Sequence, residues 1–240
     1  MAGTSQKSCT PVTRLQYIGL AGLCLASLIA HSAKAGAWTP DKGRVNLIVS
    51  TSVSETPVAD SAVTTDFYYE RGLGSGLALV FAPSISNQDT IFARNEAQLS
   101  LRRALYQKNG WAVSAQAGAY VWKEGNTEEA SSGLEARFAV GKSFKNGSWA
   151  NVETALRQCG GANSLRWEGT YGQRVRRHDR AIIKVFGDSE GCAASITRVQ
   201  ASYVYGFNEK FGLEVGWRET LPNVGNWNER GGVIGLWVAF

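Results

Sequence analysis

Residues 232–240, GVIGLWVAF, are the stretch from which the fold of this 240-residue chain can be read. Counted back from Phe240, every second residue is large and apolar: Val238, Leu236 and Ile234. A repeat of two places these side chains on one face of a β-strand. Such a strand lies either in the core of a soluble sheet or in the wall of a membrane barrel, and the rest of the chain separates the two.

Residues 1–35 have the pattern of a cleaved secretory signal. Lys7 and Arg14 form a positively charged stretch before an apolar run at residues 17–30. Residues 33–35 (AKA) follow as a small-residue cleavage site. The run is shorter than the ~20 residues that a membrane-spanning helix needs. We therefore expect residues 1–35 to be removed and residues 36–240 to form one exported domain.

The formal net charge of +5 overstates the basic character of the exported domain. The signal holds three of the 25 basic residues and no acid, which leaves 22 basic against 20 acidic residues. This small excess gives no reason to expect a nucleic-acid partner. No apolar run long enough for a spanning helix follows residue 35, so only strands could carry the chain into a bilayer.

Two cysteines, Cys159 and Cys192, remain after removal of the signal, and each is next to a glycine. In the oxidising periplasm a pair of cysteines is more often bonded than free, which predicts a disulfide. A metal site would need further ligands, and the domain holds a single histidine, His178. We expect no metal and no cofactor.

Segments of alternating apolarity recur along the domain and are separated by turn residues. Asn109-Gly110 and Asn146-Gly147 are strong hairpin signals. The expected strands are 45–51, 62–71, 77–81, 94–102, 111–121, 134–140, 150–157, 165–171, 181–187, 198–207, 211–218 and 232–240. Twelve strands, or ten if the weak segments 62–71 and 181–187 are misread, fit the even number of bacterial outer-membrane barrels.

The connections also alternate in length. Short turns are expected near 72–76, 107–110, 145–148 and 208–210, with a longer one at 174–180. They alternate with loops near 56–61, 124–132, 158–163, 188–194 and 222–231, which places both cysteines on the loop side. Aromatic residues near strand ends are predicted to form girdles at the two membrane interfaces: Tyr106, Trp111, Trp149, Phe207, Phe211 and Trp237.

Together, the export signal, the amphipathic strands and the terminal Phe240 resemble Gram-negative outer-membrane β-barrel proteins, with an organisation similar to porins. The resemblance implies an all-β fold: a closed antiparallel up-and-down transmembrane β-barrel in the cell outer membrane, in contact with outer-membrane lipid. It also implies that Phe240 belongs to the signal read by the barrel assembly machinery. The nearest functional analogy is with acidic-oligosaccharide porins that have arginine-lined lumens, although the chain carries no diagnostic motif of that group.

In a barrel of this kind the polar row of each strand lines the lumen. Its basic members are Arg44, Arg94, Arg102, Arg137, Arg157, Arg166, Lys184, Arg198 and Arg218, and its acidic members are Glu70, Glu96, Glu135, Glu153, Glu168 and Glu214. An excess of basic groups favours a narrow passive channel for small anionic solutes or oligosaccharides. The alternative is a lumen closed by paired charges, in a non-conducting barrel that serves adhesion, polymer export or phage reception.

A third class, an outer-membrane lipid hydrolase, needs a histidine beside a nucleophile or a metal. His178 instead falls in a charged turn with Arg176, Arg177 and Asp179, as expected of a solvated turn. No phosphate-binding loop is present in the sequence. The sequence therefore predicts no catalytic residue, and we do not expect an enzyme.

Overall fold

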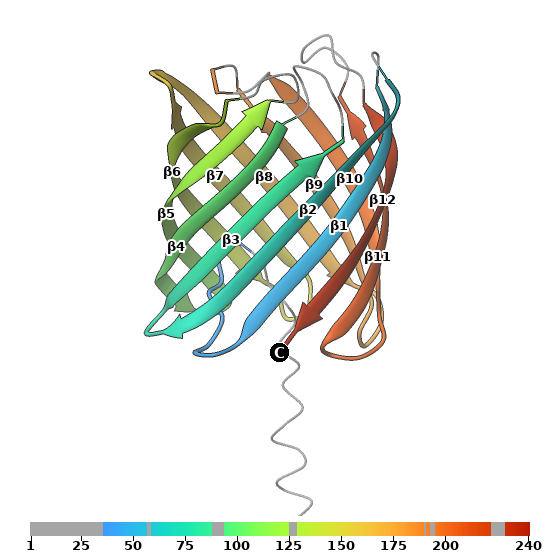
Figure 1. Ribbon diagram of the computed structural model, residues 1–240. Coiled ribbons are helices and arrows are strands. Elements are labelled where there is room, and N and C mark those ends of the chain that lie inside the picture. Colours follow the sequence, from blue (N-terminus) through green and yellow to red (C-terminus); the bar gives the residue numbers. More distant parts are fainter. Residues whose placement is uncertain are drawn as a thin grey trace, which may run out of the picture. The chain divides into compact units, whose positions relative to one another are not determined.

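The computed structural model describes residues 36–56, 59–87, 94–124, 129–189, 191–192, 195–221 and 229–240, so the predicted signal at 1–35 lies outside the described residues. Figure 1 shows a closed barrel of tilted antiparallel strands. The strands are β1 (Val45–Thr56), β2 (Ala59–Gly74), β3 (Leu77–Ser86), β4 (Arg94–Lys108), β5 (Trp111–Glu124), β6 (Ser131–Ser143), β7 (Trp149–Cys159), β8 (Ala162–Arg174), β9 (Arg180–Asp188), β10 (Ile196–Gly206), β11 (Phe211–Thr220) and β12 (Arg230–Ala239).

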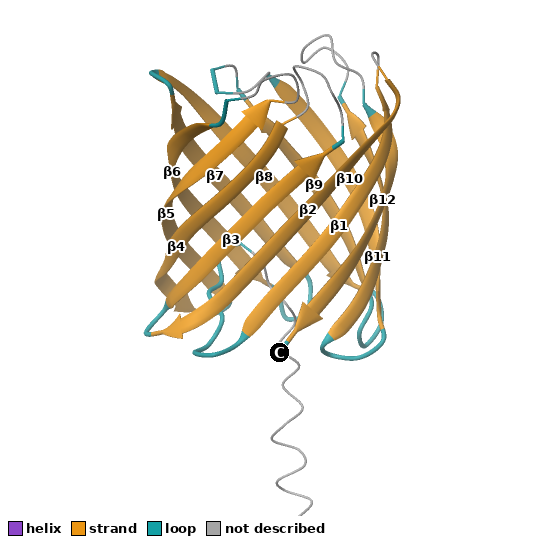
Figure 2. Cartoon of the chain, viewed as in Figure 1, coloured by secondary structure: helices purple, strands orange, loops and turns teal. Residues whose placement is uncertain are grey.

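Each strand pairs with its neighbours in sequence, and β1 pairs with β12 to close the barrel. Val45 and Phe240 extend this closing ladder through two backbone hydrogen bonds of 2.6 and 3.0 Å. The weak segments 62–71 and 181–187 lie within β2 and β9, so the prediction of twelve strands is confirmed and ten is wrong. In the part of the chain that the structure describes, no helix is long and apolar enough to cross a membrane (Figure 2).

The outer face of the barrel is apolar. Along β7, for example, Val152 and Leu156 are 64% and 58% exposed, whereas Asn151 and Glu153 on either side of Val152 are buried. The same outward row is found in most other strands, with Leu99, Leu101, Val121, Leu134, Val215, Ile234 and Leu236 among its members. A soluble sheet does the opposite, because water favours polar residues outside. The exterior therefore requires an apolar solvent, as a transmembrane barrel does.

The two ends of the barrel differ. The connections β2–β3, β4–β5, β6–β7, β8–β9 and β10–β11 lie at the end where β12 finishes, which we call the turn end; the opposite end is the loop end (Figure 1). Asn109 and Gly110 both have positive φ, 55° and 78°, as a two-residue hairpin of the predicted Asn-Gly type requires. The expected difference in length between turns and loops has an exception, because the loop-end connection between β7 and β8 is only Gly160-Gly161.

Two of the six aromatic residues predicted for the girdles point into the lumen instead of toward lipid. Trp149 and Trp237 are 4% and 5% exposed and face the lumen, so the girdle prediction is wrong for both. Trp237 lies on the opposite row from Phe240, and its indole Nε1 donates to Glu214 at 2.7 Å. Tyr106, Trp111, Phe207 and Phe211 are exposed, as a girdle requires.

Apolar side chains also fill the lumen near the turn end. One cluster joins Ala37 to Ala112 and Ala139, with Trp38 packed against it. A second joins Ile182, Val204 and Trp237, with Ile48 packed against it. All six strand residues in these clusters lie in the half of their strand nearest the turn end. We refer to these residues together with Trp149 as the apolar floor of the lumen.

The predicted disulfide is present in the structure. Cys159 is the last residue of β7 and Cys192 lies in the β9–β10 connection, and their Sγ atoms are bonded. Both cysteines are buried beside Tyr120 at the loop end. The bond therefore ties the end of one strand to a loop that follows two strands later.

We expect the double substitution Cys159→Ser and Cys192→Ser to lower the free energy of unfolding by about 3–4 kcal/mol, because the bond closes a 33-residue segment of the unfolded chain. Urea unfolding of the protein in detergent, followed by tryptophan fluorescence, measures this loss. The barrel should still form, since none of its ladders depends on the bond. A reductant should destabilise the wild type and leave the variant unchanged; equal stability of the two proteins contradicts the prediction.

Candidate functional site

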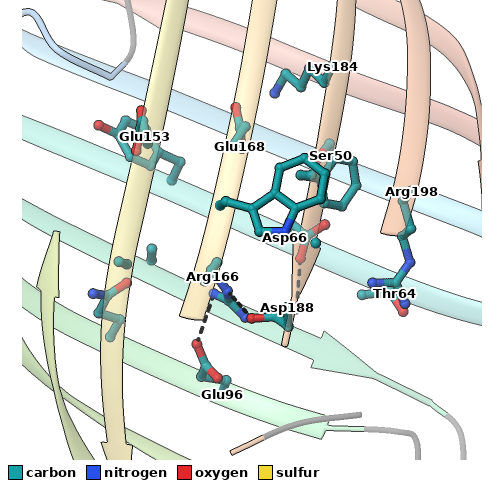
Figure 3. Close-up of a pocket in the computed structure, with 18 of the residues that line it drawn as sticks. Ser50, Thr64, Asp66, Glu96, Glu153, Arg166, Glu168, Lys184, Asp188 and Arg198 are labelled. Atoms are coloured by element: carbon teal, nitrogen blue, oxygen red, sulfur yellow. Dashed lines mark hydrogen bonds and ion pairs between the residues drawn. The ribbon is translucent and has the colours of Figure 1, made fainter. Parts of the chain in front are cut away.

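The lumen holds a cavity of about 630 Å³. At the turn end it reaches Gly36, which precedes β1, and at the loop end it reaches Asp188, Cys192 and Glu229. Figure 3 shows charged and hydroxyl side chains from several strands converging on this space. The wall between these two limits decides which solutes the space can hold.

One part of the wall is built around Arg102 of β4. Its guanidinium donates to Glu70 of β2 at 3.0 Å, to the Tyr68 hydroxyl at 3.1 Å and to Gln116 of β5 at 2.9 Å. Arg102 and Glu70 are 2% and 0% exposed. All these residues are on the inward row, so alternation along three strands brings them together.

A second group connects β4, β6 and β7. Glu135 accepts from Arg137 at 2.9 Å and from Arg157 at 2.7 Å. Arg137 also donates to Glu153 at 2.9 Å, and Arg157 also pairs with Glu96. Since β5 and β6 separate β4 from β7, the Arg157–Glu96 pair spans the curvature of the wall rather than one ladder.

Arg166 of β8 extends this group toward the loop end. It donates to Asp188 at 2.8 Å and lies 3.6 Å from Glu96 (Figure 3). Its side chain is 34% exposed, more than those of Arg137 and Arg157. Arg166 is thus the arginine of the group that is most open to a solute in the cavity.

On the opposite side, β10, β11 and Glu229, just before β12, form a third group with β1 and β2. Arg198 donates to Glu229 at 2.8 Å, and Glu229 also accepts from Ser54 of β1 at 3.1 Å. Arg218 donates to Gln200 at 3.0 Å and lies 3.7 Å from Asp66 of β2. The pair between β11 and β2 crosses β12 and β1, so it braces the barrel across its closing ladder.

At the loop end, Glu229 lies just before β12, outside the strands. Burial by itself raises the pKa of this carboxyl, but the guanidinium of Arg198 and the hydrogen bonds from Arg198 and Ser54 outweigh it and hold the pKa below its usual range. Glu229 is therefore a carboxylate at neutral pH, and the acidic side of this pair remains charged.

The predicted lumen residues do not all reach the cavity. Arg44 lies before β1 at the rim, with its side chain 51% exposed and 3.6 Å from Asp41. Arg94 is the first residue of β4, at the loop end, and its side chain is not among those described. Lys184 and Glu168 line the cavity (Figure 3), and Glu214 lines it while accepting from Gln200 and Trp237. The other predicted residues lie in the three groups described above.

His178 lies in the β8–β9 turn, at the turn end, and its backbone packs against Gly206. Its neighbour Asp179 accepts from the Tyr203 hydroxyl at 2.7 Å and from the amide of Gly206 at 3.1 Å. Within the described residues, no group of three or more His, Cys, Asp and Glu is placed to hold a metal ion. The turn therefore has a structural role, in which the Asp179 carboxylate holds the end of β10 through these two hydrogen bonds.

Comparison with solved structures finds the same architecture. The KdgM porin superposes with a TM-score of 0.58 and 7% identity over 81% of this chain and 99% of its own. The NanC porin gives 0.57 and 10% over 79% and 98%. An outer membrane channel from Pseudomonas putida F1 gives 0.61 and 11% over 87% and 100%. The chain has a porin fold.

Neither the protein-family models nor the curated proteins give a match to this sequence. At identities this low, the likeness to solved porins establishes the fold, and it leaves the solute to be argued from this lumen alone.

The lumen of this chain holds more acidic groups than the sequence indicated. Among the described residues that line the cavity or lie buried beside it, the basic groups are Arg102, Arg137, Arg157, Arg166, Lys184, Arg198 and Arg218, and the acidic groups are Asp66, Glu70, Glu96, Glu135, Glu153, Glu168, Asp188, Glu214 and Glu229. Arg174 and Arg180 lie on the same inward rows of β8 and β9, nearer the turn end. Sequence reasoning missed Asp66, Asp188 and Glu229. The alternation could have found Asp188, since it continues the inward row of Lys184 and Phe186, whereas Glu229 precedes its strand and follows no period.

We expect Arg102→Ala to lower the free energy of unfolding by about 3–5 kcal/mol, because it leaves the buried Glu70 carboxylate without its guanidinium partner. Arg230→Ala is the control: it removes a pair with Glu55 that is 67% and 65% exposed and should cost about 0–1 kcal/mol. Urea unfolding in detergent measures both. Adding Glu70→Gln to Arg102→Ala should recover part of the loss, and equal effects of the two single variants contradict a buried pair.

The stability contributed by Asp179 should depend on pH. Hydrogen bonding from the Tyr203 hydroxyl holds the pKa of Asp179 below its usual range. A lowered folded-state pKa adds stability above the unfolded-state value of about 3.9, and this stability is lost as the pH falls through the folded-state pKa. Asp179→Asn should therefore melt below the wild type at pH 7, and the gap should close under strongly acidic conditions. Heat-modifiability on gels across pH measures it; a gap that is constant with pH contradicts the assignment.

Proposed function

We propose that this protein is a passive channel of the outer membrane that admits small polar solutes. The observation that carries the proposal is the inverted polarity of the barrel: an apolar outer face encloses a polar lumen with a cavity of about 630 Å³. This volume falls in the range of about 300–1,000 Å³ that small-molecule sites occupy. The porin fold supports the same conclusion.

The orientation follows from the two ends of the barrel. In bacterial outer-membrane barrels the short turns face the periplasm and the longer loops face outward. The turn end of this barrel is then periplasmic and the loop end extracellular. Solute would enter between the loop-end residues Asp188 and Glu229 and would leave past the apolar floor.

The charges of the wall argue for polar solutes in general rather than for anions. Around the cavity, seven basic groups face nine acidic groups among the described residues, and six of the seven basic groups are arginines in ion pairs. A paired guanidinium still donates hydrogen bonds, but it attracts a distant anion less. One KdgM porin structure is a complex with disordered oligogalacturonate; for this chain we propose neutral or zwitterionic solutes of similar polarity as the better fit.

The paired charges also favour the non-conducting barrel as a second candidate. Pairs such as Arg218–Asp66 and Arg157–Glu96 join strands that are not neighbours, which is the bracing expected of a sealed structural barrel. The cavity favours the channel over this alternative, since a lumen filled only for support would leave no such space. The two candidates differ in one measurable property, ion conductance.

We expect the purified protein to form small single channels in planar lipid bilayers, with a reversal potential close to zero in a KCl gradient. Lys184→Glu should shift the preference toward cations, because Lys184 lines the cavity. Lys210→Glu, the same change in the exposed β10–β11 turn, should have a much smaller effect. A marked anion preference of the wild type supports the anionic solutes expected from the sequence instead, and no conductance in any condition favours the structural barrel.

A further inference from the structure

The segment that precedes β1 does not stay at the rim but turns into the lumen. Residues 43 and 44 anchor this segment to β2, close to the β2–β3 connection. The amide of Gly43 donates to the carbonyl of Gly72 at 2.8 Å, and the amide of Gly72 donates to the carbonyl of Arg44 at 2.9 Å. From there the chain runs back to Ala37, which is 0% exposed. A terminal segment in water would not bury an alanine completely, so the lumen holds it.

Backbone and side-chain contacts hold this segment to β7. The amide of Ala37 donates to Oδ1 of Asn151 at 3.1 Å, and Nδ2 of Asn151 donates to Glu153 at 2.8 Å. Asn151 and Glu153 are both buried on the inward row. Asn151 thus gives the segment a hydrogen-bond acceptor that is itself fixed by the ion-pair group of Glu153 and Arg137.

The wall also makes room for the aromatic ring of the segment. Trp38 lies against Gly141 of β6, where a Cβ would overlap its indole, and it meets Trp149 edge to face at 6.5 Å between centroids. Trp149 in turn covers Gly172 of β8, where a Cβ would overlap the second indole. Two inward positions on the wall are therefore glycine where a side chain would displace a tryptophan.

Gly36 borders the cavity. It is among the residues that line the cavity, and it has a φ of +94°, which favours glycine. A Cβ at this position would lie 2.6 Å from Oε1 of Glu153, so the backbone approaches the acidic group directly. The path from the cavity toward the turn end thus meets the segment before it meets the rim.

We propose that Gly36–Trp38 is a tethered plug that closes the periplasmic end of the lumen and that must leave its seat for solute to pass. The seat consists of Asn151, Gly141 and Trp149. The proposal rests on the proposed channel function and adds the regulation of that channel. The occupant is a segment of this chain, so no second molecule is needed to close the lumen.

The predicted processing of the chain strengthens the seat. Cleavage after residue 35 leaves an α-ammonium group on Gly36. A backbone nitrogen and a Cβ on the same residue are about 2.5 Å apart from standard bond lengths, so the ammonium nitrogen lies within about 5 Å of Oε1 of Glu153. The mature plug would then carry a positive charge beside a buried carboxylate, an interaction that the unprocessed chain lacks.

Single-channel recording tests the closure. Trp38→Ala and Gly141→Val should each raise the conductance, or the fraction of time spent open, several-fold over the wild type. The first variant removes the ring, and the second fills the space that it occupies. Trp217→Ala and Gly232→Val are the matched controls, because Trp217 is 53% exposed on the outer face and a Cβ on Gly232 meets nothing within 4 Å. Heat-modifiability confirms that each variant is folded.

Thiol labelling tests the seat without relying on conductance. In the folded wild type the native cysteines are bonded to each other, so Ala37→Cys adds the single free thiol among the described residues. It should react slowly with a hydrophilic maleimide while the plug is seated. Adding Gly141→Val should make the reaction several-fold faster, and adding Gly232→Val should not change it.

The outcomes separate the two proposals. Higher conductance together with faster labelling in the Gly141→Val background supports the plug. Wild-type conductance that none of the seat variants changes overturns the plug and leaves the channel standing. Fast labelling of Cys at position 37 in the parent also overturns the plug. If no variant conducts although labelling shows that Gly141→Val unseats the segment, the channel function is wrong and so is the plug's proposed role in closing it.

Discussion

The ladder between β1 and β12 is the constraint on which the rest of the structure depends. A bilayer offers no water to the free amides and carbonyls of a strand edge, so a sheet that spans it has to close on itself. Val45 and Phe240 complete this closure at the turn end through their own backbone hydrogen bonds. In the closed barrel, each strand presents one row of side chains to lipid and the other to the lumen. The alternation in residues 232–240 (GVIGLWVAF) shows both rows in a single strand.

Closure at twelve strands also sets how the charges behave. About eight strands leave space only for side chains, and about sixteen leave an open aqueous channel, so a barrel of this size lies between the two. Long side chains from separate strands meet in such a lumen, as Arg157 and Glu96 do. A buried charge without a partner is costly, which explains why each of the six arginines around the cavity pairs with an acid. The remaining cavity is what distinguishes this lumen from a filled one.

The sequence predicted those features that depend on period and on turn chemistry. Strand number, the inward row and the Asn109-Gly110 hairpin follow from alternation and from φ preferences, and the disulfide follows from compartment and count. The inward direction of Trp149 and Trp237 was not predicted, because proximity to a strand end was weighed above the parity of the position. Glu229 and the segment at Trp38 lie outside the strands, where no period exists, and their places depend on contacts with Arg198 and Gly141 that only the folded barrel brings together.

The position of Trp38 has an energetic consequence for how a closed lumen could open. Because the segment is tethered at Gly43, its seating is a unimolecular equilibrium and needs no high affinity. Fully burying one large apolar side chain is worth about 1.5–3 kcal/mol, which is an upper limit for the partly buried Trp38. An equilibrium biased by that amount leaves roughly 1–10% of the molecules open. Seating Trp38 against Gly141 therefore gives a closure that can reverse spontaneously. A much more stable closure would seal the barrel permanently, and the cavity above it would then have no use.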